Sequence, residues 1–331
     1  MSKNILLSVL VLVSQSNIAS IAAVRASAGG LIAFTLTDAS GRLQIFTMRP
    51  DGTGEKQLTF EGDNGRPAWS RDGKRIVFIA HRGRSRNPEA GDHMYVAVMN
   101  ADGSQQRLLT EGNAPDWSPD GKRIAFCGPA AGLPGAQIFV MDADGGNRRQ
   151  ITHSPTWKCG PSWSPDGRRM AFILMQNPAS PSDPQPRIGI MNADGSGERV
   201  LTVERRVNVR VQPDGTETVL ETADDANAPA WSPAGDRIAF WSGIENQYGQ
   251  IWVINADGTG SRQLTDDPSH RNNDDPSWSP DGKQILFGTA RGGRVEIWVM
   301  DSDGKHQRRL HPMDPFPFPG RASWQPVVNV R

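Results

Sequence analysis

Short apolar runs recur along the chain, and clusters of Gly, Asp and Pro separate each run from the next. The clearest unit is the string W-S-P-D-G-K-R-I-A-F at residues 117–126. Near copies of it lie at residues 69–78, 163–172, 231–240 and 278–287. Because an Asp-Gly cluster between two short apolar runs is typical of a tight hairpin, each copy predicts two antiparallel strands. We name them strand A, which contains the Trp, and strand B, which ends at the Phe.

A second string lies between these copies and has the form I-W-V-M-D-x-D-G, followed by a segment that ends in Leu-Thr. It predicts two further strands, C and D, joined by another tight turn. Its Asp-Gly pair occurs six times, at Asp51, Asp102, Asp144, Asp194, Asp257 and Asp303. A repeat of about 45 residues with four strands has the length of one propeller blade.

Two half copies flank the complete ones and specify how the ring closes. Residues 31–34 have the second half of the first string without its Trp, and residues 323–326 have the first half without its Phe. Pairing the strand at Trp324 beside the strand that ends at Phe34 makes a sixth copy. An open solenoid gives no reason for this split, and a sandwich rarely keeps so strict a period. The sequence therefore predicts an all-β, closed six-bladed propeller of four-stranded antiparallel blades.

The aromatic residues of the repeat are best assigned to packing between blades, because equivalent aromatics at one period are what a repeated core requires. Composition agrees with an all-β chain: 35 Gly and 25 Pro make long helices improbable. The 36 basic and 36 acidic residues balance. We therefore exclude bulk electrostatic attraction to nucleic acid or to an anionic membrane.

The N-terminus has the pattern of a secretory signal. Lys3 precedes an apolar run at residues 5–13, and small residues follow as far as Ala28. That run is about half of what spans a bilayer, so we expect no membrane span in the mature chain. We predict a signal at residues 1–28, a single propeller domain at residues 29–331, and a periplasmic or secreted protein, monomeric by expectation.

The two rims of the predicted ring differ in sequence. Turns A to B and C to D fall on one rim, here called the tight-turn rim, and are short. Connections B to C and D to A fall on the other, the loop-rich rim, which collects every long connection. Because binding residues concentrate in long loops held on a rigid scaffold, we predict the functional face there. Its candidates are Arg66, His81, His93, Asn113, Asn227, His270, Asp274, Asp275 and Arg321.

Residues 203–226 form an insertion with an alternating pattern, which predicts an extra hairpin on the loop-rich rim. It is either a partner contact or a tolerated surface excursion. Trp157 and Trp241 lie on neighbouring connections of the same rim. They are stronger candidates for a partner contact, since an exposed Trp is a frequent binding hot spot.

No local motif supports catalysis. The chain has no G-x-S-x-G and no H-E-x-x-H, its His residues are scattered over several blades, and the Asp-Gly turns lack the further acidic positions of a calcium loop. We therefore predict no catalytic residues, no metal site and no cofactor.

The only two cysteines, Cys127 and Cys159, lie on the loop-rich rim in adjacent blades. Export would place them in an oxidising compartment, so a disulfide is open to them. Two free, partly buried thiols are the alternative, since geometry could forbid the bond.

The W-S-P-D-G-K-R-I-A-F and M-N-A-D-G strings resemble the repeats of the TolB-like propellers of bacterial envelope proteins, over nearly all of residues 30–328. The resemblance implies a propeller that binds an envelope protein or peptide, and the absence of a catalytic motif favours such a scaffold over an enzyme. Exported lyases with a related propeller bind a divalent ion through channel His side chains, and they supply the alternative: a metal-dependent, carbohydrate-active enzyme.

Overall fold

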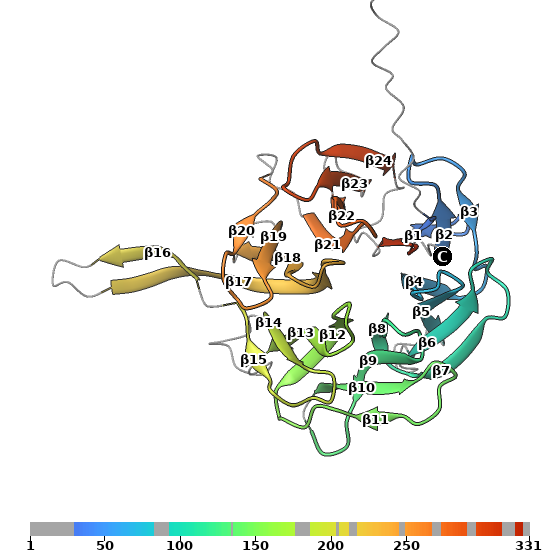
Figure 1. Ribbon diagram of the computed structural model, residues 1–331, viewed down its shortest axis with the longest axis horizontal. Coiled ribbons are helices and arrows are strands. Elements are labelled where there is room, and N and C mark those ends of the chain that lie inside the picture. The colour runs from blue at the N-terminus through green and yellow to red at the C-terminus, as the bar shows by residue number, and fades with distance from the viewer. Residues whose placement is uncertain are drawn as a thin grey trace, which may run out of the picture.

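The computed structural model describes residues 30–82, 93–133, 135–175, 186–202, 205–211, 217–244, 249–266, 273–289, 296–312 and 322–326. These residues form strands and turns, and no helix occurs among them that could cross a membrane. Six sheets stand around a ring, and a two-stranded ribbon projects from one of them (Figure 1).

Five of the six sheets have four antiparallel strands, and the innermost strand is given first here. Blade 1 has β25 (Ser323–Trp324), β1 (Ile32–Thr37), β2 (Leu43–Met48) and β3 (Lys56–Gln57). Blade 2 has β4 (Asp63–Trp69), β5 (Arg75–Arg82), β6 (His93–Asn100) and β7 (Arg107–Glu111). Blade 3 has β8 (Asn113–Trp117), β9 (Arg123–Pro129), β10 (Ala136–Asp142) and β11 (Arg149–Gln150). Blade 4 has β12 (Trp157–Trp163), β13 (Arg169–Met175), β14 (Arg187–Asn192) and β15 (Arg199–Val200). Blade 6 has β21 (Asn273–Trp278), β22 (Gln284–Thr289), β23 (Glu296–Asp301) and β24 (Arg308–Pro312).

Blade 5 has a fifth strand, which pairs with an extension of its innermost strand. Its strands are β16 (Arg205–Val211), β17 (Glu217–Trp231), β18 (Arg237–Ile244), β19 (Gln250–Asn255) and β20 (Arg262–Gln263). From Ala223 onward β17 pairs with β18 as the inner strand of the blade, whereas residues 217–222 pair with β16 alone. The resulting ribbon extends away from the ring (Figure 1).

The ring closes as the half copies predicted. Strand β25 pairs antiparallel with β1, with Trp324 opposite Ile32 and Ser323 opposite Ala33. The first sheet therefore contains both ends of the propeller. The predicted six-bladed, closed, all-β fold is confirmed.

One hydrophobic cluster fills each of the six interfaces between blades. The cluster between blades 1 and 2, for example, joins Ala33 and Ile45 to Trp69, Ile76 and Phe78. Each of the other five clusters contains the equivalent Trp, and all six of these Trp side chains are buried. The assignment of the repeated Trp and Phe to packing between blades is thus correct.

Arginine side chains add a second link between neighbouring blades. The Arg that begins strand B lies over the Trp ring of the next blade, with its guanidinium carbon 4.5–5.0 Å from the ring centroid: Arg75 over Trp117, Arg123 over Trp163, Arg169 over Trp231 and Arg237 over Trp278. This is the geometry of a cation–π contact. It explains why the repeat carries Arg at the base of strand B.

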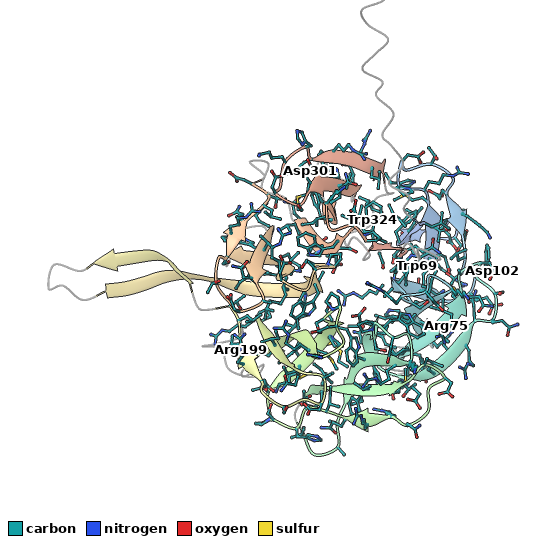
Figure 2. The ribbon with its side chains drawn as sticks, viewed as in Figure 1. Trp69, Arg75, Asp102, Arg199, Asp301 and Trp324 are labelled. Carbon is teal, nitrogen blue, oxygen red and sulfur yellow. A yellow bond between two sulfur atoms is a disulfide. The ribbon has the colours of Figure 1, made fainter. Side chains whose placement is uncertain are left out.

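The outer strands carry a third link. At the start of a D strand, a basic side chain donates to the carbonyl of the C to D turn in the following blade: Lys56 to Asp102, Arg199 to Asp257 and Arg262 to Asp303. Figure 2 shows Trp69 and Trp324 near the centre of the ring and Asp102 and Arg199 near its periphery. The interfaces between blades 4 and 5 and between blades 5 and 6 therefore carry both the inner and the outer link.

Candidate functional site

Every described inner strand with more than two residues carries a bulge three residues before its Trp. The pairing with strand B shifts there, for example between Gly65 and Ala68 in blade 2 and between Asp274 and Ser277 in blade 6. The bulged residue has a positive φ in all five cases: Arg66 (53°), Ala114 (49°), Gly160 (59°), Ala228 (50°) and Asp275 (47°). A bulge leaves one residue out of the ladder and re-aims its side chain. The propeller thus presents one such position per blade at the innermost strand.

Two of these bulged residues meet across the ring. The Nη2 of Arg66 in blade 2 lies 3.4 Å from Oδ1 of Asp275 in blade 6. Blade 1 stands between those two blades, so the pair must pass across the inner edge of blade 1, through the central channel. The side chain of Arg66 is 41% exposed and that of Asp275 is 12% exposed. A pair that is partly open to water adds at most about 1 kcal/mol to stability.

Asp274 places a second carboxyl beside this pair. Its Oδ1 is buried and has no hydrogen-bond partner. Burial, and next the negative charge of Asp275, raise the pKa of Asp274 well above its usual value, while Arg66 opposes them. An unpartnered buried polar atom is rare in folded proteins and calls for an explanation. The loop-rich half of the channel therefore holds two acids against one base.

The other predicted polar residues do not all converge on this group. His81 is the penultimate residue of β5, in register with Asp63. His93 begins β6, the third strand of its blade, and its Nδ1 lies 3.2 Å from Oε1 of Glu111 on the exposed surface. Asn113 is on an inner strand, and its Oδ1 accepts the N–H of Ala114. Among the predicted residues whose side chains the structure describes, Arg66, Asp274 and Asp275 are brought together.

Three of the remaining candidates are described only in part or not at all. The backbone of Asn227 lies in β17, opposite Trp241. His270 and Arg321 lie outside the described residues, and so does the segment 1–28 that is predicted to be a signal.

The two candidate tryptophans are partly buried. Trp157 begins β12 and packs against a small cluster of Ala114, Cys127 and Cys159. Trp241 in β18 packs against the cluster between blades 5 and 6. Each ring therefore contributes to the core as well as to the surface, so its removal will also lower stability.

Cys127 and Cys159 form a disulfide, with their Cα atoms 5.0 Å apart. It joins β9 of blade 3 to the bulged inner strand β12 of blade 4. Both residues are almost completely buried. The bond ties two blades together close to the loop-rich rim.

Beside this disulfide lies Lys158, a buried lysine that the sequence analysis did not identify. Its Nζ contacts the hydroxyls of Ser154 and Thr156, and it lies 3.4 Å from Oε1 of Glu198. The repeat carried a signal for it, since blades 2 and 6 have Asn at the equivalent position, five residues before the Trp. In those blades the Asn donates to a Gln of the preceding blade: Asn64 to Gln44 and Asn273 to Gln250.

Metal ligands do not gather among the residues that the structure describes: no three His, Cys, Asp or Glu side chains there lie close enough to hold an ion. The acids Asp274 and Asp275 are accompanied by a base, which is unlike a cation site. The arrangement can instead receive polar and charged groups of a partner that enters the channel.

A cavity of about 180 Å³ lies at the opposite end of the channel, on the tight-turn rim. Its wall repeats from blade to blade and includes all six repeat tryptophans: Trp69, Trp117, Trp163, Trp231, Trp278 and Trp324. The repeat pattern did not indicate this cavity, because the same Trp side chains also pack between the blades and the turns of this rim are short. We call it the turn-side cavity.

The profile of the TolB beta propeller domain matches residues 111–227 and 216–316, which together span more than half of the chain. The Tol-Pal system protein TolB of Anaeromyxobacter dehalogenans is 33% identical over 117 residues, 35% of this chain and 22% of that protein. An uncharacterized protein of Agrobacterium fabrum is 34% identical over 92 residues, 27% of this chain and 30% of that protein. The chain thus aligns with less than a third of the length of either relative.

Solved structures of TolB proteins have the same fold as this chain. TolB from Acinetobacter baumannii superposes with a TM-score of 0.68 at 19% identity, over 90% of this chain and 67% of that one. A putative TolB from Agrobacterium tumefaciens superposes with a TM-score of 0.59 at 21% identity, over 88% of this chain and 92% of that one. An oligogalacturonate lyase in complex with manganese superposes with a TM-score of 0.50 at 16% identity, over 86% of this chain and 74% of that one. The repeat strings, the closed six-bladed ring and the sequence profile lead to one conclusion: the chain belongs to the TolB beta propeller domain family.

Proposed function

We propose that this protein is a non-catalytic binding scaffold of the bacterial envelope, which holds a protein or peptide partner at the loop-rich end of its channel. The observation that carries the proposal is the Arg66–Asp275 pair with Asp274 beside it. The pattern of residues 1–28 supports export, to the periplasm or beyond the cell.

The fold itself does not require these charges. Ala114, Gly160 and Ala228 occupy the same bulged position in three other blades, with the same positive φ. A propeller of this sequence family therefore closes with small side chains at this position. Charged residues in the channel add stability only weakly, and Asp274 reduces it. Such departures from the repeat are expected where a ligand is recognised.

The shape of the wall suits an inserted segment of a partner. Small residues on the side of blades 3 to 5 leave room for such a segment. The charged group on the side of blades 2 and 6 would orient it. A segment that carries both a basic and an acidic or amide group would satisfy the unpartnered oxygen of Asp274 and compete for Arg66. The long connections of the same rim would then surround the body of the partner.

Affinity capture tests this function. The mature protein is immobilised as wild type, as Arg66→Glu and as Lys122→Glu, and each is exposed to envelope extract. Lys122 is an exposed base in the A to B turn of blade 3, on the tight-turn rim, and is the matched charge-reversal control. We expect a polypeptide that wild type and Lys122→Glu retain and Arg66→Glu loses. Equal retention by all three proteins would contradict a site in the channel.

Elemental analysis of the purified protein tests the alternative. A stoichiometric transition metal, together with depolymerisation of an acidic polysaccharide, would replace the scaffold with a metal-dependent enzyme. If the protein does not depolymerise the polysaccharide and Arg66→Glu loses the partner, the binding scaffold is supported.

A further inference from the structure

The turn-side cavity is built from one short segment repeated in each blade. Each blade contributes its Trp, and most contribute the proline two residues later: Pro119, Pro165, Pro233, Pro280 and Pro326. Indole and pyrrolidine rings line this wall, and polar atoms between the rings make up the larger part of its exposed surface. It lies on the rim opposite the site proposed above, so an occupant of one end leaves the other end accessible.

One blade departs from this pattern at the cavity wall. In blade 2 the residue two positions after the Trp is Arg71, where the five other copies have Pro. The turn itself is unchanged by the exchange. Gly73 donates to the carbonyl of Ser70 at 2.8 Å, as Gly121 donates to Ser118 at 2.9 Å in blade 3. The replacement therefore alters the wall and not the backbone: it substitutes a guanidinium for an apolar ring.

The guanidinium of Arg71 is available to a ligand. Arg71 is exposed, and it forms no ion pair within the part of the chain that the structure describes. The acid on the same wall, Asp116, has another task, since its Oδ2 accepts the backbone N–H of Trp163 at 2.9 Å and joins blades 3 and 4. Arg71 thus brings a guanidinium to a cavity that is lined by both aromatic rings and polar groups.

The size of the cavity limits what can enter. The cavity measures about 180 Å³, and a volume of about 150 Å³ is enough for one benzene ring. There is room for one ring or one short branched chain. Guanidinium matches a carboxylate with two parallel hydrogen bonds, better than it matches any neutral group.

We propose that the turn-side cavity binds a carboxylate attached to one apolar ring or short branched chain, with Arg71 holding the carboxylate and the Trp-Pro wall holding the apolar part. Two sources share this chemistry: a free small organic acid, and the C-terminal residue of a peptide. Binding at this end is independent of the partner site at the loop-rich rim.

Titration of the full chain with benzoate and with N-acetyl-leucine, followed by calorimetry and tryptophan fluorescence, tests the proposal. Benzamide and N-acetyl-leucine amide are the matched neutral probes. We expect both acids, or one of them, to bind and to change the emission of the wall tryptophans. We expect the neutral probes to bind about tenfold more weakly or worse, because they lose the charge-assisted hydrogen bonds. Binding of benzoate alone assigns a free organic acid, and binding of N-acetyl-leucine alone assigns a peptide C-terminus.

The decisive variant is Arg71→Pro, which restores the residue that the repeat has elsewhere and should fold at least as well as wild type. It should lose the preference for acid over amide, whereas Lys122→Ala, a base of the neighbouring turn away from the wall, should keep it. Equal binding of acid and amide by wild type, unchanged acid binding by Arg71→Pro, or no binding of either acid would each overturn the proposal.

Discussion

The side-chain amide of Gln325 donates a hydrogen bond to the carbonyl oxygen of Gly73, 252 residues earlier in the chain, at 2.8 Å. The Oε1 of the same side chain accepts the N–H of Leu31, and the backbone N–H of Gln325 donates to the carbonyl of Leu31. Gln325 stands where every complete copy of the repeat has Ser. A longer side chain is needed here because the A to B turn is cut in blade 1, and one residue must link the last strand to blade 1 and to blade 2.

Replacing Gln325 with Ala should weaken the closure of the ring. Leu31 and Gly73 would each lose a partner at the seam, at about 1–3 kcal/mol for a partly buried group. Gln263→Ala is the control, because its amide bonds only to the carbonyl of Thr265 within one blade. Thermal unfolding should show a clearly lower midpoint for Gln325→Ala than for Gln263→Ala. Equal midpoints would contradict this role.

Arg123→Leu should destabilise the interface between blades 3 and 4. The variant keeps most of the aliphatic stem and removes the guanidinium that lies 4.9 Å from the Trp163 ring centroid. The expected loss is about 1 kcal/mol. Blade 6 offers a matched control, since Gln284 occupies the equivalent position and no cation lies there; Gln284→Leu should change the free energy of unfolding much less. Urea titrations of both variants measure the difference.

Reduction of the Cys127–Cys159 bond should lower stability by about 2–4 kcal/mol, because the bond closes a loop of this length in the unfolded chain. The residues are 32 apart in sequence and lie in adjacent blades. A melting curve recorded with and without reductant shows the shift, and the double variant Cys127→Ala/Cys159→Ala should be insensitive to reductant. Thiol titration of the denatured, unreduced protein should find no free thiol; two per chain would disprove the bond.

Asp274→Asn should stabilise the protein at neutral pH. Burial, followed by the charge of Asp275, raises the pKa of Asp274 in the folded protein, so its contribution to stability is fully present below its unfolded pKa of about 3.9 and is lost as pH rises through the folded pKa. The advantage of the Asn variant should therefore be largest near pH 7 and disappear in acid.

Asp166→Asn should behave in the opposite way and serves as the comparison. The hydroxyl of Ser164 and the N–H of Arg168 hold the pKa of Asp166 below its usual value. Its contribution is present above the unfolded pKa and is lost as pH falls through the folded pKa. Melting curves across pH should show Asp166→Asn losing stability near pH 7 but not in acid. Parallel curves for the two variants would refute the assignment.

The fold was predictable from sequence because each blade repeats the same solution. One Trp, one Asp-Gly turn and one Ile-Ala-Phe run recur in register, and the half copies at Phe34 and Trp324 leave a single way to pair them. Periodicity locates strands well, but it says nothing about side chains that break the period. Arg66 and Asp275 meet only because blades 2 and 6 flank blade 1, which is a property of the closed ring.

The same reasoning explains what was missed. The bulge that turns Arg66 and Asp275 toward each other leaves no mark in the pattern of apolar residues, since Ala114 and Gly160 do the same in other blades. The turn-side cavity was hidden because Trp69 and its equivalents serve both the interface and the wall. Arg71 was visible in the sequence as a departure from Pro, and that departure could have been noted.

The seam at Gln325 also bears on the connectivity of the chain. Strand β25 contributes two residues to its sheet, yet it occupies the same place as inner strands of five to seven residues in blades 2, 3, 4 and 6. Physically, the break in blade 1 is one of six equivalent places at which the circle could be cut. A circular permutant that joins residue 326 to residue 30 through a Pro-Asp-Gly turn and opens the chain at the A to B turn of blade 4 would preserve every interface between blades. The position of the ends would then be a matter of gene order rather than of architecture.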